Sequence, residues 1–303
     1  MPAMSEAAYT CQSETAPLAS VAVKCPREAW RDQASVDREW LALGYLDRPD
    51  FVSAVGQHEA FLERLGEGCE LVRLPADART GLDSIYARDA SIATDRGLIL
   101  CNMGKHARRG EPSAQADAFA AAGIPVLGAI GGTGTLEAGD VAWLGPALLA
   151  VGRSYRSNDA GISQLRELLG DCVEIVVVDL PHWHGSGALL HLMSILSPLD
   201  DDLALVHSPL MPVRFRELLL ERGMGLVEAA VEEIATQACN VLALAPREVM
   251  AVAGNPRTRA RLEDAGVRVA EFPGADICVK GGGGPTCLTR PLKRRLRVRR
   301  QAL

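Results

Sequence analysis

A short unit that recurs five times along the chain constrains the fold more than any other feature. Each copy has an amphipathic stretch of helical character, a glycine that ends it, and a short strand rich in aliphatic residues; the five strands begin near residues 71, 124, 173, 225 and 267. Helix and strand each carry an apolar face that neither can bury alone, so the units must pack against one another. The repeat therefore predicts an α/β protein whose five units form a closed ring.

A doubly wound α/β sheet is the alternative, because it also alternates helices and strands. Two features weigh against it. No GxGxxG motif follows the first strand, and most helices are preceded by an apolar hairpin-like stretch, such as residues 147–151, that simple βαβ alternation does not need. In a ring, loops from different units converge on the axis, where catalytic residues from distant parts of the sequence can meet.

Composition indicates a folded chain without a membrane or nucleic-acid partner. The 303 residues are 48% apolar and 23% charged, and the net charge of −6 is spread along the chain. No segment approaches the ~20 apolar residues of a membrane helix, and the first residues do not resemble a secretory signal, so we expect a cytoplasmic protein. Residues 1–35 lack clear periodicity and are predicted to be a poorly structured extension. After this extension we predict a single domain over residues 36–292 and a basic tail over residues 293–303.

Cysteine usage singles out one thiol. The eight cysteines include no CxxC pair, which indicates reduced thiols and no zinc site, but Cys287 directly follows a glycine-rich segment, 281–284, that can expose backbone N–H groups. A thiol nucleophile needs a nearby histidine, and His191 stands at a boundary between a loop and regular structure. His182 and His184 suggest a metal site, but they lack the acid–histidine run of manganese ureohydrolases, so we expect no metal. A plain glycine-rich loop remains the alternative for Cys287.

Two further segments place acidic residues where a core would not need them. Residues 82–89 are predicted to form a strand, in which alternate side chains point to the same side, so Asp83 and Asp89 would share one side. Glu137 and Asp140 stand in a glycine-containing turn. Four motifs then occur in order: Tyr-Ala-Arg-Asp (86–89), Leu-Glu-Ala-Gly-Asp (136–140), His-Leu-Met-Ser (191–194) and Gly-Gly-Gly-Pro-Thr-Cys (282–287). Together they resemble the guanidino-group modifying superfamily, which includes dimethylarginine dimethylaminohydrolases, arginine deiminases and amidinotransferases. Its fold is a five-bladed, pseudo-symmetric α/β propeller called the pentein fold.

The resemblance implies a metal-free, cofactor-free hydrolase of a small guanidino amino acid. Its implied residues are the nucleophile Cys287, the acid/base His191, the guanidinium-binding acids Asp89 and Glu137, and the substrate-binding residues Asp83, Arg108, Arg156 and Asp140. Asp83 would bind the α-ammonium group, and the two arginines would bind the α-carboxylate. The reaction would pass through an amidino-cysteine intermediate and give citrulline plus an amine or ammonia. A homodimer is possible.

Departures from the family pattern leave the subfamily open. Met193 stands where deiminases and amidinotransferases place an acid, which favours a dimethylarginine dimethylaminohydrolase, provided that an extended backbone turns it to the same side as His191. Arg88 instead resembles the deiminases, and Ala138 replaces a frequent glycine. An arginine deiminase or dihydrolase and an amidinotransferase are the alternatives within the family. A non-catalytic pentein binding protein is the alternative from another class.

Overall fold

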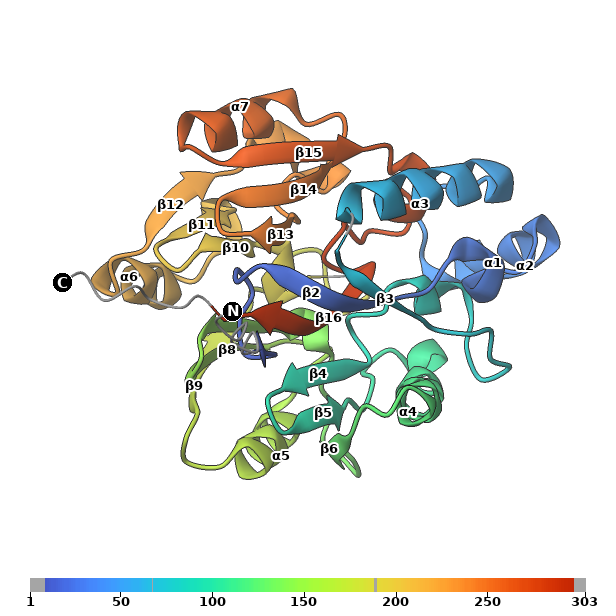
Figure 1. Ribbon diagram of the computed structural model, residues 1–303, viewed down its shortest axis with the longest axis horizontal. Helices are drawn as coiled ribbons and strands as arrows, with labels where there is room; N and C mark the ends of the chain where they lie inside the picture. Colours follow the sequence, from blue (N-terminus) through green and yellow to red (C-terminus); the bar gives the residue numbers. More distant parts are fainter. Residues whose placement is uncertain (1–8, 67, 188–189, 297–303) are drawn as a thin grey trace, which may run out of the picture.

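The computed structural model describes residues 9–66, 68–187 and 190–296. These residues form a mixed α/β domain with five small sheets, one of four strands and four of three strands. In each three-stranded sheet an antiparallel hairpin is followed by a helix and then by a strand that pairs in parallel with the second strand of the hairpin. The helices lie at the periphery of the molecule, with the sheets between them (Figure 1).

The three-stranded sheets contain four repeats of the same unit. They are β4 (Ser91–Thr94), β5 (Gly97–Leu100), α4 (Glu111–Ala121) and β6 (Val126–Ala129); β7 (Val141–Gly145), β8 (Leu148–Arg153), α5 (Asp159–Leu169) and β9 (Glu174–Asp179); β10 (Leu196–Asp200), β11 (Leu203–Val206), α6 (Val213–Glu221) and β12 (Gly225–Glu228); and β13 (Leu242–Ala245), β14 (Glu248–Val252), α7 (Pro256–Asp264) and β15 (Arg268–Phe272). The five-fold repeat of helix, glycine and strand predicted from the sequence is confirmed.

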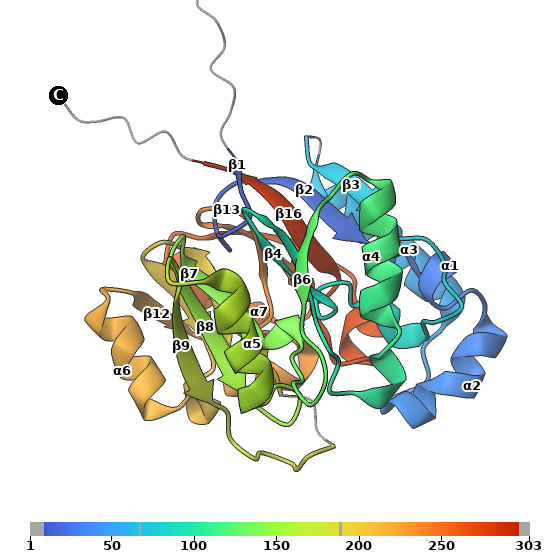
Figure 2. The ribbon, with the colours of Figure 1, turned by 90° about the horizontal axis from the view of Figure 1, so that it is seen from below.

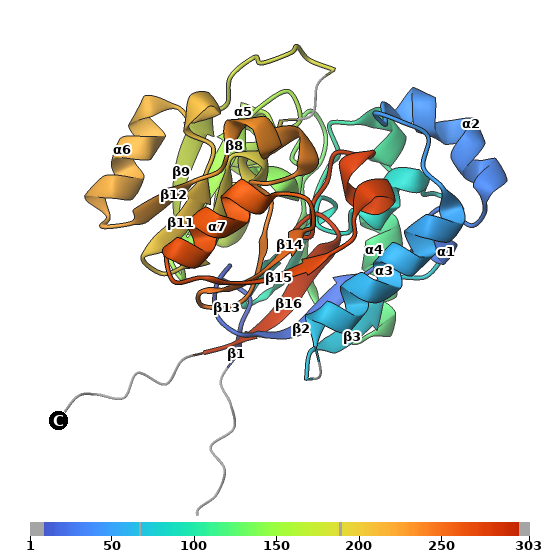
Figure 3. The ribbon, with the colours of Figure 1, turned by 90° about the horizontal axis from the view of Figure 1, so that it is seen from above.

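The fifth sheet joins the two ends of the chain. Its order is β1-β16-β2-β3, and its elements are β1 (Tyr9–Thr10), β2 (Leu18–Val23), α1 (Pro26–Ala29), α2 (Gln33–Leu43), α3 (Phe51–Leu65), β3 (Glu70–Arg73) and β16 (Thr289–Arg295). Strands β2 and β16 pair antiparallel and run side by side in Figures 2 and 3. The last strand of the chain therefore completes the sheet that the first strands begin.

The hydrophobic core consists of five clusters, and each cluster joins two neighbouring sheets. Representative pairs are Ile92 with Val141, Ala150 with Leu196, Leu205 with Val249, Val21 with Met250, and Ala22 with Leu98. Every sheet thus packs against two others, which explains why no single unit can bury its apolar face alone. No helix among the described residues is long and apolar enough to cross a membrane.

The predicted boundaries at both ends of the chain are wrong. Residues 9–35 are not a poorly structured extension, because all six residues of β2 are buried between β16 and β3. The predicted tail begins too early, since Lys293 and Arg294 belong to β16, and Arg294 is buried and donates to the Ala243 carbonyl. A strand buried on both faces shows no alternation, so its sequence carries little periodic signal. Residues 1–8 and 297–303 of the predicted extensions lie outside the described part.

Candidate active site

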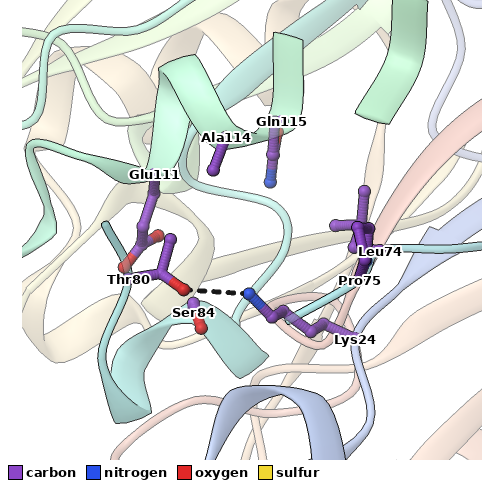
Figure 4. Close-up of a pocket in the computed structure, with 8 residues that line it drawn as sticks. All are labelled: Lys24, Leu74, Pro75, Thr80, Ser84, Glu111, Ala114 and Gln115. Carbon is purple, nitrogen blue, oxygen red and sulfur yellow. Dashed lines mark hydrogen bonds between the residues drawn. The ribbon is translucent and has the colours of Figure 1, made fainter. Parts of the chain in front are cut away.

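One cavity of about 1010 Å³ collects most of the residues that the sequence motifs singled out. Its lining includes Asp89, Arg156, His191 and Cys287, which come from four different repeats of the fold. Glu111 borders a second hollow of only about 10 Å³, where Lys24 Nζ donates to Thr80 Oγ1 (Figure 4). A hollow of that size holds about one water molecule, so the large cavity is the candidate site for an organic substrate.

Cys287 is held by a glycine run that allows very close packing. A Cβ atom on Gly283 would lie 2.6 Å from Tyr86 Cε1, and one on Gly284 would lie 2.5 Å from Asn240 Oδ1. Neither glycine has a positive φ, whereas Gly282, which precedes both, has a φ of 77°. The sequence predicted only that this segment can expose backbone N–H groups; the structure shows that glycine is also required at 281, 283 and 284, because neighbouring side chains leave no room for a Cβ.

The thiol of Cys287 is buried and protonated in the free site. The residue is 9% exposed, and burial together with the charge of Asp89 raises the pKa of the thiol to about 12. Arg88 and a hydrogen bond from Asn240 act in the opposite direction. A protonated thiol is a poor nucleophile, so Cys287 needs a positive charge or a hydrogen-bond donor close to its sulfur that favours the thiolate.

His191 lies between two carboxylates. Its Nε2 is 2.9 Å from Glu137 Oε2, and its Nδ1 is 4.0 Å from Asp89 Oδ1. Burial alone would lower the pKa of His191, but Asp140, Glu137 and Asp89 outweigh burial and raise it to about 9. Burial would raise the pKa of Glu137, yet the hydrogen bond and charge of His191 lower it to about 2. The imidazole is therefore a cation at neutral pH and can act as a general acid.

Asp140 orients the histidine segment and does not line the cavity. Its Oδ1 accepts a hydrogen bond from the backbone N–H of Leu192 (3.0 Å), and its Oδ2 accepts from the hydroxyl groups of Ser154 (2.6 Å) and Ser157 (2.7 Å). The side chain is fully buried. The implied substrate contact of Asp140 stays a prediction; in this structure its oxygens hold the turn that carries His191.

Asp89 offers one free carboxylate oxygen. Its Oδ2 accepts from Arg108 Nη1 at 2.5 Å, whereas its buried Oδ1 has no hydrogen-bond partner among the described residues. Leaving a buried carboxylate oxygen without a donor is costly, which indicates that a ligand supplies the donor. The segment that carries Asp83 and Asp89 is not the predicted strand but a 3₁₀ turn, Leu82–Ile85, followed by tight turns.

Arg108 lines the cavity but is largely engaged by internal partners. Besides Asp89, its Nε and Nη2 donate to the carboxylate of Glu111 at 2.9 and 2.7 Å, and Nη2 donates to the Tyr86 carbonyl at 3.0 Å. The implied role of Arg108 as an α-carboxylate contact stays a prediction. In this structure its bonds fix the orientation of Asp89.

The other two residues of the implied amino-acid clamp face the cavity. Arg156 is only loosely engaged, with Nη1 3.4 Å from Glu137 Oε2. Asp83 is already paired, since Lys105 Nζ lies 2.7 Å from its Oδ2 and also donates to the Leu43 carbonyl at 2.6 Å. An α-ammonium group that binds Asp83 must therefore compete with Lys105.

Several cavity residues were missed by sequence reasoning. Asn240 and Lys105 are two of the polar ones, and Leu46, Tyr155 and Trp183 form an exposed apolar part of the lining. Asn240 had one detectable signal, because it is a polar residue placed between Cys239 and the apolar strand β13. Within the described ranges, no group of three or more His, Cys, Asp or Glu side chains is arranged to hold a metal ion.

Fold and site together define a cysteine-dependent enzyme that acts on amidines: the Cys287 thiol, the His191 imidazolium and the Asp89 carboxylate line one cavity, and the buried Glu137 carboxylate is hydrogen-bonded to the imidazolium. The model of the arginine deiminase family matches residues 83–219 and 213–294, so the chain belongs to this family, whose enzymes are cysteine-dependent amidine hydrolases. The resemblance drawn from the four sequence motifs is thereby confirmed.

Similar proteins from bacteria extend this result. The N(G),N(G)-dimethylarginine dimethylaminohydrolase of Pseudomonas aeruginosa is 28% identical over 253 residues, which cover 82% of this chain and 92% of that protein. An arginine deiminase of Mycobacterium marinum is 27% identical over 283 residues, 76% of this chain and 69% of that protein. A structure of the Pseudomonas aeruginosa enzyme in complex with citrulline superposes with a TM-score of 0.73 at 26% identity and covers 91% of this chain and 99% of that chain.

Proposed function

We propose that the protein hydrolyses the guanidino group of arginine or an N-methylated arginine through a covalent amidino-cysteine intermediate on Cys287. The products are citrulline and ammonia or an amine. The observation that carries the proposal is the buried Oδ1 of Asp89, which has no donor among the described residues and lies in the same cavity as Cys287 and His191. We further infer that the five sheets are the blades of a pseudo-symmetric pentein propeller, which is supported by the core clusters that join each sheet to two others.

Substrate binding supplies the charge that the thiol needs. A guanidinium group is a planar cation with N–H donors on every edge, so the free Oδ1 of Asp89 can bind it by charge-assisted hydrogen bonds. Glu137 lies outside the cavity lining and already accepts from the Lys105 N–H (2.8 Å) and contacts His191 Nε2 (2.9 Å), so it binds the cation by exchanging one of these partners. The arriving cation stabilises a thiolate at Cys287, and the thiol proton is released to solvent. Binding and activation of the nucleophile are therefore coupled.

The first half of the reaction forms a carbon–sulfur bond. The thiolate of Cys287 attacks the guanidinium carbon and forms a neutral tetrahedral adduct, whose N–H groups the carboxylates hold in place. The imidazolium of His191 donates its proton to the departing nitrogen as the carbon–nitrogen bond breaks. Ammonia or an amine leaves, and a positively charged S-amidino-cysteine remains.

The second half returns the enzyme to its starting state. The neutral imidazole of His191 removes a proton from a water molecule, whose oxygen attacks the same carbon. The carbon–sulfur bond breaks as the carbonyl forms, Cys287 takes the bonding electrons, and the remaining hydroxyl proton of the adduct moves to the sulfur, which restores the thiol. The released product carries a neutral ureido group, which binds the two carboxylates less strongly than the guanidinium cation does.

Met193 favours N-methylated substrates. It lies in a 3₁₀ turn, Leu192–Ser194, rather than in an extended segment, yet it still lines the cavity and is 2% exposed. A thioether gives an unmodified guanidinium no charged partner, whereas it can pack against an N-methyl group, with a gain of about 0.8 kcal/mol for one buried methyl.

The test is a substrate panel. We expect mass spectrometry to show citrulline from arginine, monomethylarginine or asymmetric dimethylarginine, with a higher kcat/KM for the methylated forms. A tenfold or greater preference for plain arginine would refute the role of Met193, and no turnover of any guanidine would favour the non-catalytic alternative. Transfer of the amidino group to added glycine or ornithine would favour an amidinotransferase. Light scattering of the same sample tests the predicted homodimer.

A further inference from the structure

Asn240 is a buried side chain of the cavity that contacts both catalytic segments. It is 4% exposed and directly precedes the strand pair β13–β14. Its Nδ2 lies 3.4 Å from Cys287 Sγ and donates to the Met193 carbonyl at 3.3 Å, while its Oδ1 accepts from the backbone N–H of Thr286 at 3.1 Å. One amide therefore connects the turn that carries Cys287 with the turn that follows His191.

We propose that Asn240 is a catalytic residue whose amide N–H holds the sulfur of Cys287 in the attacking position and stabilises its thiolate. This inference rests on the proposed function in one respect, namely that Cys287 is the nucleophile. It adds a group that none of the four family motifs contains.

The orientation of the amide is fixed by its neighbours. The backbone N–H of Thr286 is only a donor, so it must face Oδ1, and the Met193 carbonyl is only an acceptor, so it must face Nδ2. Rotating the amide by half a turn would place donor against donor and acceptor against acceptor. The N–H group therefore points at the sulfur in the one arrangement that satisfies all the contacts.

The turn that carries the thiol is built against this amide. A Cβ on Gly284 would lie 2.5 Å from Oδ1 and 2.7 Å from Cγ of Asn240. The hydroxyl of Thr286 also donates to the Val241 carbonyl at 2.8 Å, which forms a second link between the same two segments. Both the donor and the sulfur are thus fixed before substrate binds, as preorganised stabilisation requires.

A hydrogen bond to sulfur is stronger for the thiolate than for the thiol, so it favours ionisation. In agreement with this, the Asn240 bond opposes the effect of burial on the pKa of Cys287. Hydrogen bonds to charged groups contribute about 1.5–3 kcal/mol, which corresponds to a rate change of about 10- to 150-fold if the bond is made only to the thiolate.

The experiment compares Asn240→Ala and Asn240→Asp with Asn255→Ala as a control. Asn255 is equally buried at 4% but bonds to Thr236 and the Val252 carbonyl, outside the cavity lining. The Asp variant keeps an oxygen for the Thr286 N–H and replaces the donor by an acceptor, so it tests the donor even if the Ala variant does not fold. Two readouts are taken: kcat/KM across pH, and the rate of iodoacetamide alkylation of Cys287 without substrate at one pH of ~9, followed by peptide mass spectrometry.

We expect kcat/KM to fall about 10- to 100-fold in both Asn240 variants and the alkylation rate to fall about tenfold, the change that a rise of about one unit in the thiol pKa produces. Asn255→Ala should lower thermal stability without changing the alkylation rate. A folded Asn240→Asp protein with the wild-type alkylation rate and kcat/KM within about threefold of wild type would overturn the inference. Alkylation needs no substrate, so it tests Asn240 independently of turnover. A wild-type protein that turns over no guanidine would therefore refute the proposed function, while the alkylation result would still test the contact between Asn240 and Cys287.

Discussion

Gly139 is the residue at which the smallest change should cause the largest loss of activity. A Cβ at this position would overlap Nδ1 of His191 and would lie 2.7 Å from Asp89 Oδ1 and 2.8 Å from His191 Cε1. Ordinary van der Waals contact begins at 3.4 Å, so the Asp89 oxygen alone would have to retreat by about 0.7 Å. Gly139→Ala therefore displaces the acid/base and the guanidinium ligand together.

The expected loss follows from that displacement. Misplacing reacting groups by about 1 Å costs about 100-fold in rate, so we expect kcat/KM of Gly139→Ala to fall about 100-fold or more. Overpacking costs about 1–3 kcal/mol of stability, which for a chain of this size lowers Tm by about 2–10 °C and leaves the protein folded. Steady-state kinetics and thermal unfolding of the same preparation measure both effects.

Gly145→Ala is the matched control, because Gly145 lies at the end of β7, the strand that follows the same turn, and has nothing within 4 Å of its added Cβ. We expect its kcat/KM to stay within about twofold of wild type. If Gly139→Ala were as active as this control, the positions assigned to His191 and Asp89 would be wrong.

Three further predictions concern conditions and specificity. Activity should rise with pH up to about 9, because the Cys287 thiol must lose its proton while His191, whose pKa is raised to about 9, must keep its own. An activity optimum at or below pH ~6 would contradict a deprotonated thiol and a protonated His191 as the active state. Lys105→Met should lower the KM for arginine about three- to tenfold, because the α-ammonium no longer competes for Asp83; a raised KM in steady-state assays would show that Lys105 helps binding. EDTA should not inhibit, because the thiol, imidazole and carboxylates supply the nucleophile and the acid; inhibition reversed by Mn²⁺ would favour a site at His182 and His184.

The sequence predicted those parts of the fold that depend on local patterns. The strands that close the units were expected near residues 71, 124, 173, 225 and 267, and β3, β6, β9, β12 and β15 begin within two residues of these positions. Glycine stops and amphipathic helices are local signals, so they can be read without knowing which units are neighbours. The four motifs likewise identified Asp89, His191 and Cys287, and the structure places all three in the lining of one cavity.

Features that depend on distant partners could not be predicted. The role of β2 is set by pairing with β16 at the other end of the chain, and no pattern within residues 1–35 reports that contact. Arg108 was assigned to substrate because its own motif does not reveal that Asp89 and Glu111 occupy it. Asn240 was missed for the same reason, since its importance lies in its contact with Cys287, which is 47 residues away in sequence.

The most direct test of the account is to look for the covalent intermediate. The enzyme is quenched with acid during turnover of a methylated arginine, and its peptides are analysed by mass spectrometry. The account predicts an added amidino adduct on the peptide that contains Cys287, none on the peptide that contains Cys239, and a loss of turnover of ~10³-fold or more in Cys287→Ala. Consumption of substrate without an adduct at Cys287, together with near wild-type turnover by Cys287→Ala, would contradict it.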